Sequence, residues 1–169
     1  MAPTRVFHGA IVVTARTDRP DIAGVIAPPP LIYVGVMILA LLLQRLHPIG
    51  LLPWRFVVPV GVATLLLGLI AIPAVLAFRR AKTRPEPWKP TTALVTSGPY
   101  RFTRNPMYVG FTMLYVGAAC WLNTAWPVIL LPLALGLMQY GVIAREEVYL
   151  ERLFGAEYRA YCSRVRRWL

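Results

Sequence analysis

The stretch that decides the fold is Asn105–Ala144, which reads NPMYVGFTMLYVGAACWLNTAWPVILLPLALGLMQYGVIA and holds no Asp, Glu, Lys or Arg over 40 residues. As one α-helix it would be about 60 Å long, twice the hydrocarbon thickness of a bilayer. It must therefore fold back on itself. Asn123 to Pro127, with a turn-favouring Asn and Pro and an interfacial Trp, predicts the turn. We expect spans at about residues 106–122 and 127–144.

Two more apolar runs precede this hairpin. Ile22–Gln44 and Phe56–Phe78 each cover 23 residues without a charge, and 57% of the chain is hydrophobic against 15% charged. Such a composition excludes an ordinary water-soluble domain. We expect spans at about 31–46, behind the triple proline 28–30, and at 56–78. The predicted fold is an all-α polytopic membrane protein with four transmembrane helices, forming a single domain over residues 1–169.

Three residues of the second run predict its shape. Pro73 lies inside the run, where a kink is expected because proline cannot donate a helical hydrogen bond. Gly61 and Gly68 are seven residues apart and share a helix face. Such small residues allow a neighbouring helix to approach closely.

The positive charges predict the orientation. The chain carries 18 Lys and Arg against 7 Asp and Glu, a net charge of +11. The connection 46–54 contains neither Lys nor Arg, whereas 79–104 and the tail 145–169 are rich in them. By the positive-inside rule both basic segments and the N-terminus, with Arg5, Arg16 and Arg19, face the cytoplasm. The charge therefore predicts an inner-membrane protein and no nucleic-acid partner.

The tail carries an apolar stripe at helical spacing. The stripe comprises Leu150, Phe154, Tyr158, Tyr161 and Val165, with arginines between them. It predicts either a cytoplasmic amphipathic helix on the anionic inner leaflet or a helix that closes over the bundle as a lid. Cys120 and Cys162 are predicted to be structural and unpaired.

Polar chemistry gathers where the hairpin meets the cytoplasm. Folding the last two spans together brings Arg104-Asn105-Pro106 beside Arg145-Glu146-Glu147. Asn105 is a good N-cap and Pro106 a good first helical residue, so the helix end and nearby arginines would attract a carboxylate. Tyrosines would stack on a base, and the glutamates would bind an ammonium group or sugar hydroxyls. These features describe S-adenosylmethionine, but they equally describe a capped helix with boundary arginines.

Three ordered motifs add a resemblance. Thr96–Gly110 (TSGPYRFTRNPMYVG), then Glu146-Glu147, then Phe154–Tyr161 (FGAEYRAY) resemble the isoprenylcysteine carboxyl methyltransferase and phospholipid methyltransferase superfamily. The resemblance covers about residues 94–169. It implies a multi-span membrane methyltransferase with its S-adenosylmethionine pocket at the cytosolic end of the last two spans. No Rossmann-type Gly-x-Gly of soluble methyltransferases is present.

The resemblance also implies site residues. The cofactor-binding candidates are Gly98, Tyr100, Arg104, Asn105, Pro106, Tyr108, Glu146 and Glu147; the catalytic candidates are Glu147, Tyr108 and Arg164; no metal site is predicted. Asn105 stands where relatives more often have His, so it provides no general base. Arg166 stands where many relatives have Pro.

The predicted reaction is methyl transfer to a lipophilic acceptor that arrives from the bilayer, alongside membrane lipids. The leading prediction is an isoprenylcysteine carboxylate, which needs no base. A phospholipid amine or a small thiol must lose a proton, to Glu147, Glu146 or Tyr108, while Arg145 or Arg164 would orient an acidic acceptor. The rival from another class is a non-catalytic membrane protein that packs with a partner; cofactor binding distinguishes the two.

Overall fold

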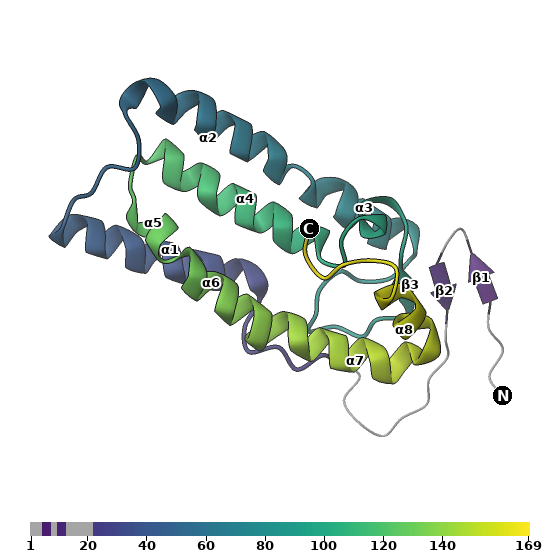
Figure 1. Ribbon diagram of the computed structural model, residues 1–169. Helices are drawn as coiled ribbons and strands as arrows, with labels where there is room; N and C mark the ends of the chain where they lie inside the picture. Colours follow the sequence, from purple (N-terminus) through teal and green to yellow (C-terminus); the bar gives the residue numbers. More distant parts are fainter. Residues whose placement is uncertain (1–4, 8–9, 13–21) are drawn as a thin grey trace.

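A computed structural model of the chain describes residues 5–7, 10–12 and 22–169, with side chains from residue 22 onward. Arg16 and Arg19, which we expect to face the cytoplasm, lie outside the described residues. Most of the chain is helical, and the helices run side by side along one long axis (Figure 1). One end of the bundle, called here the connection end, carries residues 47–53 and 122–125. The opposite end, called the tail end, carries 81–105 and 155–169.

The helices occupy the predicted apolar runs. The first half contains α1 (Pro29–Leu46), α2 (Trp54–Gly68) and α3 (Ala71–Arg80). The second half contains α4 (Pro106–Trp121), α5 (Trp126–Ile129), α6 (Leu131–Met138), a π-helical turn (Gln139–Ile143), α7 (Ala144–Phe154) and α8 (Ala156–Cys162). Prolines stand in the first turn of α1 and α4, where a missing N–H costs nothing. The predicted turn between the last two spans is confirmed.

Two helical segments have the length and hydropathy of membrane spans within the described residues. They are Pro29–Leu46, of 18 residues, and Trp54–Arg80, of 27 residues. Their large apolar side chains are widely exposed, as on a surface that faces lipid. Helix α4 has 16 residues, and α5 and α6 are shorter. Four crossings therefore remain a prediction.

The helix over the second apolar run is interrupted before Pro73. We expected a kink at Pro73, but α2 ends at Gly68 and α3 begins at Ala71. Pro73 has no N–H to donate to the Leu69 carbonyl four residues earlier. The backbone forms a tighter turn of the 3₁₀ type instead, in which Ile72 N–H donates to the Leu69 carbonyl at 2.9 Å.

Glycines bring α2 and α4 together along most of their length (Figure 1). A Cβ at Gly68 would lie 2.6 Å from the Leu114 side chain, and one at Gly117 would lie 2.8 Å from Leu65. A Cβ at Gly110 would meet backbone, at 3.0 Å from both Ala71 N and Gly68 O. The predicted close approach at Gly61 and Gly68 is thus confirmed, with glycines of α4 as its other half.

Polar groups join the two turns at the connection end. Asn123, at a φ of +46°, accepts hydrogen bonds from the backbone N–H groups of Leu51 and Leu52. Thr124 donates to the Gln44 side chain at 2.8 Å, and Trp126 Nε1–H donates to the His47 carbonyl at 2.7 Å. These bonds fix α1 and α2 against the second hairpin.

The tail end differs from the all-α prediction. A short antiparallel sheet forms there in the order β1 (Arg5–Phe7), β2 (Ala10–Val12), β3 (Ala93–Val95). The tail is not one continuous helix, because it bends at Gly155, whose φ is +53°. Its apolar stripe packs on β3 in a cluster of Leu94, Leu150, Phe154, Tyr158, Tyr161 and Val165. The stripe therefore packs inside the protein, as expected for a lid. Contact of the tail with a membrane surface stays a prediction.

The glycine contact predicts a stability difference. Gly110→Ala places a methyl group against rigid backbone of α2 and α3, and overpacking of this kind typically costs about 1–3 kcal/mol. Gly136→Ala is the matched control, because a Cβ there meets nothing within 4 Å and alanine favours helix. Thermal unfolding in detergent should give a lower Tm for the first variant and an unchanged or higher Tm for the second. Equal Tm values would contradict the packing argument.

Candidate functional site

A pocket opens at the tail end between α4, α7 and the 84–95 segment. Its enclosed volume is about 80 Å³, and the cavity continues into open solvent. Six predicted residues line it: Tyr100, Arg104, Asn105, Tyr108, Glu146 and Glu147. The hairpin argument predicts that Arg104-Asn105 and Glu146-Glu147 lie side by side, and these four residues line one cavity.

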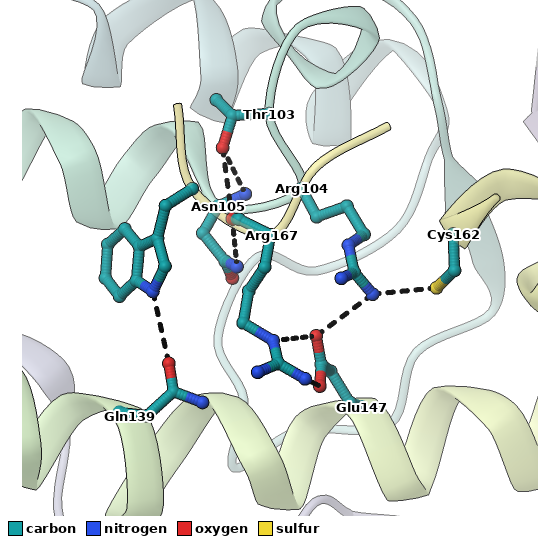
Figure 2. A network of polar contacts seen from close by, with 8 residues as sticks. Thr103, Arg104, Asn105, Gln139, Glu147, Cys162 and Arg167 are labelled. Carbon is teal, nitrogen blue, oxygen red and sulfur yellow. Dashed lines mark hydrogen bonds and ion pairs between the residues drawn. The ribbon is translucent and has the colours of Figure 1, made fainter. Parts of the chain in front are cut away.

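Glu147 lies at the centre of an ionic network (Figure 2). Arg104 Nη1 is 3.1 Å from one of its oxygens, and Arg167 donates from Nε at 2.9 Å and from Nη2 at 2.6 Å. The fork-like contact with Arg167 is bidentate, which favours a fixed geometry. Arg104 also donates to Cys162 Sγ at 2.8 Å. The network joins the start of α4, the first turn of α7 and the tail.

Residues 166–168 cross over the start of α4; we call them the strap. Arg104 N–H donates to the Arg166 carbonyl at 2.9 Å. The Arg167 carbonyl accepts bonds from Thr103 Oγ1 at 3.2 Å and from Asn105 Nδ2 at 2.8 Å (Figure 2). The strap therefore closes the region where we expected an open helix end.

Asn105 corrects a prediction. It occupies the N-cap position of α4, but its side chain forms no capping hydrogen bond. Its own carbonyl accepts the N–H groups of Tyr108 and Val109 at 3.0 Å. The amide is used instead to hold the strap. These two N–H groups are consequently not available to bind a carboxylate, as the helix-end prediction required.

Glu146 has different hydrogen-bond and charge partners from Glu147. A π-helical turn precedes α7, and its extra residue changes the faces that the following residues present. The Tyr108 hydroxyl donates to Glu146, at 2.8 and 2.9 Å from its two oxygens. Enclosure away from bulk water raises the pKa of Glu146 to about 7, opposed by the Tyr108 hydrogen bond and assisted by the charge of Glu147.

The pocket holds buried polar atoms that lack partners. The Tyr100 hydroxyl and Arg104 Nε are buried and form no hydrogen bond with the described residues. Such atoms carry a desolvation cost unless a ligand or water binds them. Aromatic, cationic and anionic groups thus lie side by side around the cavity. The set fits a polar ligand that carries both a carboxylate and a cationic or aromatic part.

Three predicted residues lie away from the cavity. Gly98 is exposed in a 3₁₀ turn (Gly98–Arg101), where its φ of +62° accounts for the glycine. Pro106 is fully buried as the first residue of α4. Arg164 is exposed and donates to the Ala160 carbonyl at 3.1 Å, so it does not face the pocket.

Sequence reasoning missed Arg167, which lies three residues after the predicted Arg164. Arg167 and not Arg164 contacts a pocket glutamate. The arginine-rich tail indicates that a cation could reach the pocket, but spacing alone does not tell which of its several arginines contacts Glu147.

A second, apolar groove lies along the same helices. Its cavity volume is about 550 Å³, and its surface is largely apolar. Its lining comprises Val109, Thr112, Met113, Leu135, Gly136, Gln139, Tyr140, Trp168 and Leu169. Trp168 Nε1–H donates to Gln139 Oε1 at 3.1 Å. The strap thus contacts the pocket through Arg167 and the groove through Trp168.

Comparison with known proteins identifies the family of the chain. The sequence matches the family model described as phospholipid methyltransferase over residues 57–157. Over 66 residues, 37% of this chain and 100% of the relative, it is 44% identical to a Haemophilus influenzae protein named only as uncharacterized. No solved structure matches the chain. The matched region runs from α2 to α8 and includes both pocket walls, and the chain belongs to the phospholipid methyltransferase family of membrane proteins.

Proposed function

We propose that this protein transfers a methyl group from S-adenosylmethionine to a lipid-borne acceptor at the membrane. One observation carries the proposal: a pocket that contains charged side chains and a groove without them share two walls, α4 and the continuous helical segment from α6 to α7. Two ligands of opposite polarity can therefore meet along one helix pair. Family membership supports methyl transfer as the reaction.

The pocket is the proposed donor site. S-adenosylmethionine, when bound, supplies an electrophilic methyl group on a sulfonium. Arg104, with its unpaired Nε, is positioned for the donor's carboxylate, and the Tyr100 hydroxyl is a further polar contact. Glu147 holds Arg104 in place through their ion pair. Tyr158 and Tyr161 offer aromatic faces for a base.

The groove is the proposed site of the acceptor's hydrocarbon chain. It lies between helices whose outward faces carry exposed apolar residues, including Leu133 and Leu137 of α6. A lipid can then bind without leaving the bilayer while the polar donor enters from water. Holding donor and acceptor in line is the main catalytic task for a single displacement. The candidate acceptors are a phospholipid amine, a prenylated-cysteine carboxylate and a thiol.

Donor binding tests the function. Calorimetry with S-adenosylhomocysteine in detergent should show binding, and Arg104→Ala should weaken it by roughly 10- to 150-fold, the loss of a charge-assisted contact worth about 1.5–3 kcal/mol. Arg159→Ala is the control, because Arg159 is exposed and pairs only at 3.4 Å with Glu151. Folded parent protein that binds nothing would favour a non-catalytic packing role.

Filling the groove tests the acceptor site. Gly136→Phe projects a ring into open space, so the fold should tolerate it. We expect the KM for a lipid acceptor to rise by about tenfold or more, the effect of roughly 1.4 kcal/mol of lost binding, with unchanged S-adenosylhomocysteine affinity. Gly35→Phe on α1 is the matched control, since a Cβ there also meets nothing within 4 Å. An unchanged KM for Gly136→Phe would exclude the groove.

The proposed orientation places the tail end in the cytoplasm. Basic residues gather there, whereas residues 46–54 contain neither Lys nor Arg. An impermeant maleimide added to intact cells should label Gly50→Cys and should not label Ser97→Cys. The parent, with only its half-buried and buried cysteines, gives the background. Labelling of Ser97→Cys alone would reverse the orientation.

A further inference from the structure

The groove is polar at one end and apolar at the other. Gln139 and Trp168 meet at the end beside the pocket, since the next turn of the same helix brings Ile143 into the pocket wall. Leu135 lies about 6 Å from Gln139 in the opposite direction along the helix axis, and Met113 lines the facing wall. None of the described residues that line the groove is Asp, Glu, Lys or Arg. An amphipathic ligand therefore fits in one direction, with its polar end at Gln139.

Few hydrogen-bond donors of the groove are open to a ligand. Thr112 Oγ1–H donates to the Tyr108 carbonyl at 2.8 Å, and the Trp168 indole N–H donates to Gln139. Two side-chain donors of the lining have no partner among the described residues, the Gln139 amide nitrogen and the Tyr140 hydroxyl. Tyr140 is 78% exposed, which leaves its side chain weakly held. Gln139 is half-buried and is the donor with a defined direction.

The strap fixes the Gln139 amide. An indole N–H donates and cannot accept, so Gln139 directs Oε1 to Trp168 and its NH₂ group away from the indole. Figure 2 shows the amide nitrogen on the side of Gln139 that faces Glu147. The backbone is held as well, because Gln139 begins the π-helical turn, whose Gly141 carbonyl accepts the Ile26 N–H at 3.1 Å. The NH₂ group thus has a fixed direction, toward the pocket.

We propose that Gln139 positions the acceptor lipid: its amide NH₂ group donates to an oxygen at the polar end of the lipid, and the hydrocarbon chain extends toward Leu135. This inference rests on the proposed function and adds the contact that places the reacting end of the lipid beside the donor pocket. A misplacement of about 1 Å can cost about 10²-fold in rate. Trp168 is a positioning residue, since it acts on the lipid through Gln139.

Steady-state kinetics separate the two ends of the groove. The probe acceptors are diacyl phosphatidylethanolamine and N-acetyl-S-farnesylcysteine in mixed micelles, and the variants are compared on the one that the parent methylates. Gln139→Met keeps the side-chain length without the N–H groups. Its kcat should fall by about tenfold or more, because the polar end loses its alignment. Its KM should rise by no more than about fivefold, because the chain keeps its apolar walls.

Donor binding and a neighbouring variant control this experiment. S-adenosylhomocysteine affinity of Gln139→Met should stay within about threefold of the parent, since Gln139 does not line the pocket. Tyr140→Phe, which removes the other donor, should keep the parent's kcat. A raised KM with an unchanged kcat in Gln139→Met would overturn the proposal. A parent that binds no S-adenosylhomocysteine and methylates neither probe would instead refute the proposed function itself.

Trp168→Phe distinguishes positioning of the lipid from a structural role. A ring still fills the place of the indole, but the N–H is lost and the Gln139 amide can rotate. The kcat should fall less than in Gln139→Met, because a rotating amide still donates part of the time. Equal losses of kcat in the two variants, together with weakened S-adenosylhomocysteine binding, would mean that the pair only holds the strap and would overturn the proposal.

Ether-linked phosphatidylethanolamine, which has no acyl carbonyl, identifies the oxygen. Where the ester carbonyl is the partner, Gln139→Met and the parent should have the same kcat with the ether lipid. Where the phosphate is the partner, Gln139→Met should lose as much kcat with the ether lipid as with the ester lipid. Both results support the Gln139 contact, and a variant that equals the parent with both lipids contradicts it.

Fluorescence quenching tests the direction of the lipid without turnover. The emission of Trp168 is the difference between the spectra of the parent and of Trp168→Phe. In phosphatidylcholine vesicles, bromines near the carboxyl end of the acyl chain should quench this emission more than bromines near the methyl end, because Trp168 lies at the polar end of the groove. Gly136→Phe, which fills the groove, should reduce the quenching. Stronger quenching by bromines near the methyl end would overturn the proposed direction.

Discussion

The ion pairs of Glu147 hold together the parts of the chain that surround the pocket. Arg104 enters from the start of α4 and Arg167 from the strap, and both meet one carboxylate on α7. Removing that carboxylate would leave two guanidinium groups facing each other without compensation, at a partly enclosed site where charge interactions are strong. The α7 wall would then lose its ionic contacts with the helix start and the strap, which stay joined to each other by hydrogen bonds to the Arg166 and Arg167 carbonyls. One negative charge on α7 thus joins two positive ones at the edge of the pocket.

Much of this architecture follows from sequence features that act locally. The charge-free run around Asn123–Pro127 required a turn, the prolines marked the starts of α1 and α4, and Gly61 and Gly68 indicated the close helix pair. The motif residues Tyr100, Arg104, Tyr108, Glu146 and Glu147 indeed line one cavity. These predictions succeed because each depends on helix period, helix length or the conformational limits of one residue type.

The parts that were not predicted depend on contacts between distant residues. The backbone break at Leu69–Ile70 arises because Pro73 has no N–H for the Leu69 carbonyl, which accepts the Ile72 N–H instead. Both helices beside this break, α2 and α3, pack against α4. Residue spacing in the tail allows a membrane-surface helix, whereas the structure shows that its apolar stripe packs on Leu94. Asn105 was assigned as a side-chain cap, whereas the strap carbonyl takes its amide. Periodicity contains no information about which segment returns to cover a site.

The strap is made after every other part of the pocket, since residues 166–168 follow both walls in the sequence. Newly synthesised α4 and α7 can pack before Arg167 is available, but Glu147 then has only one of its two cationic partners. The pocket therefore reaches its final shape only after residues 166–168 have been made. The groove is completed by the same segment, because Trp168 lines it and donates to Gln139.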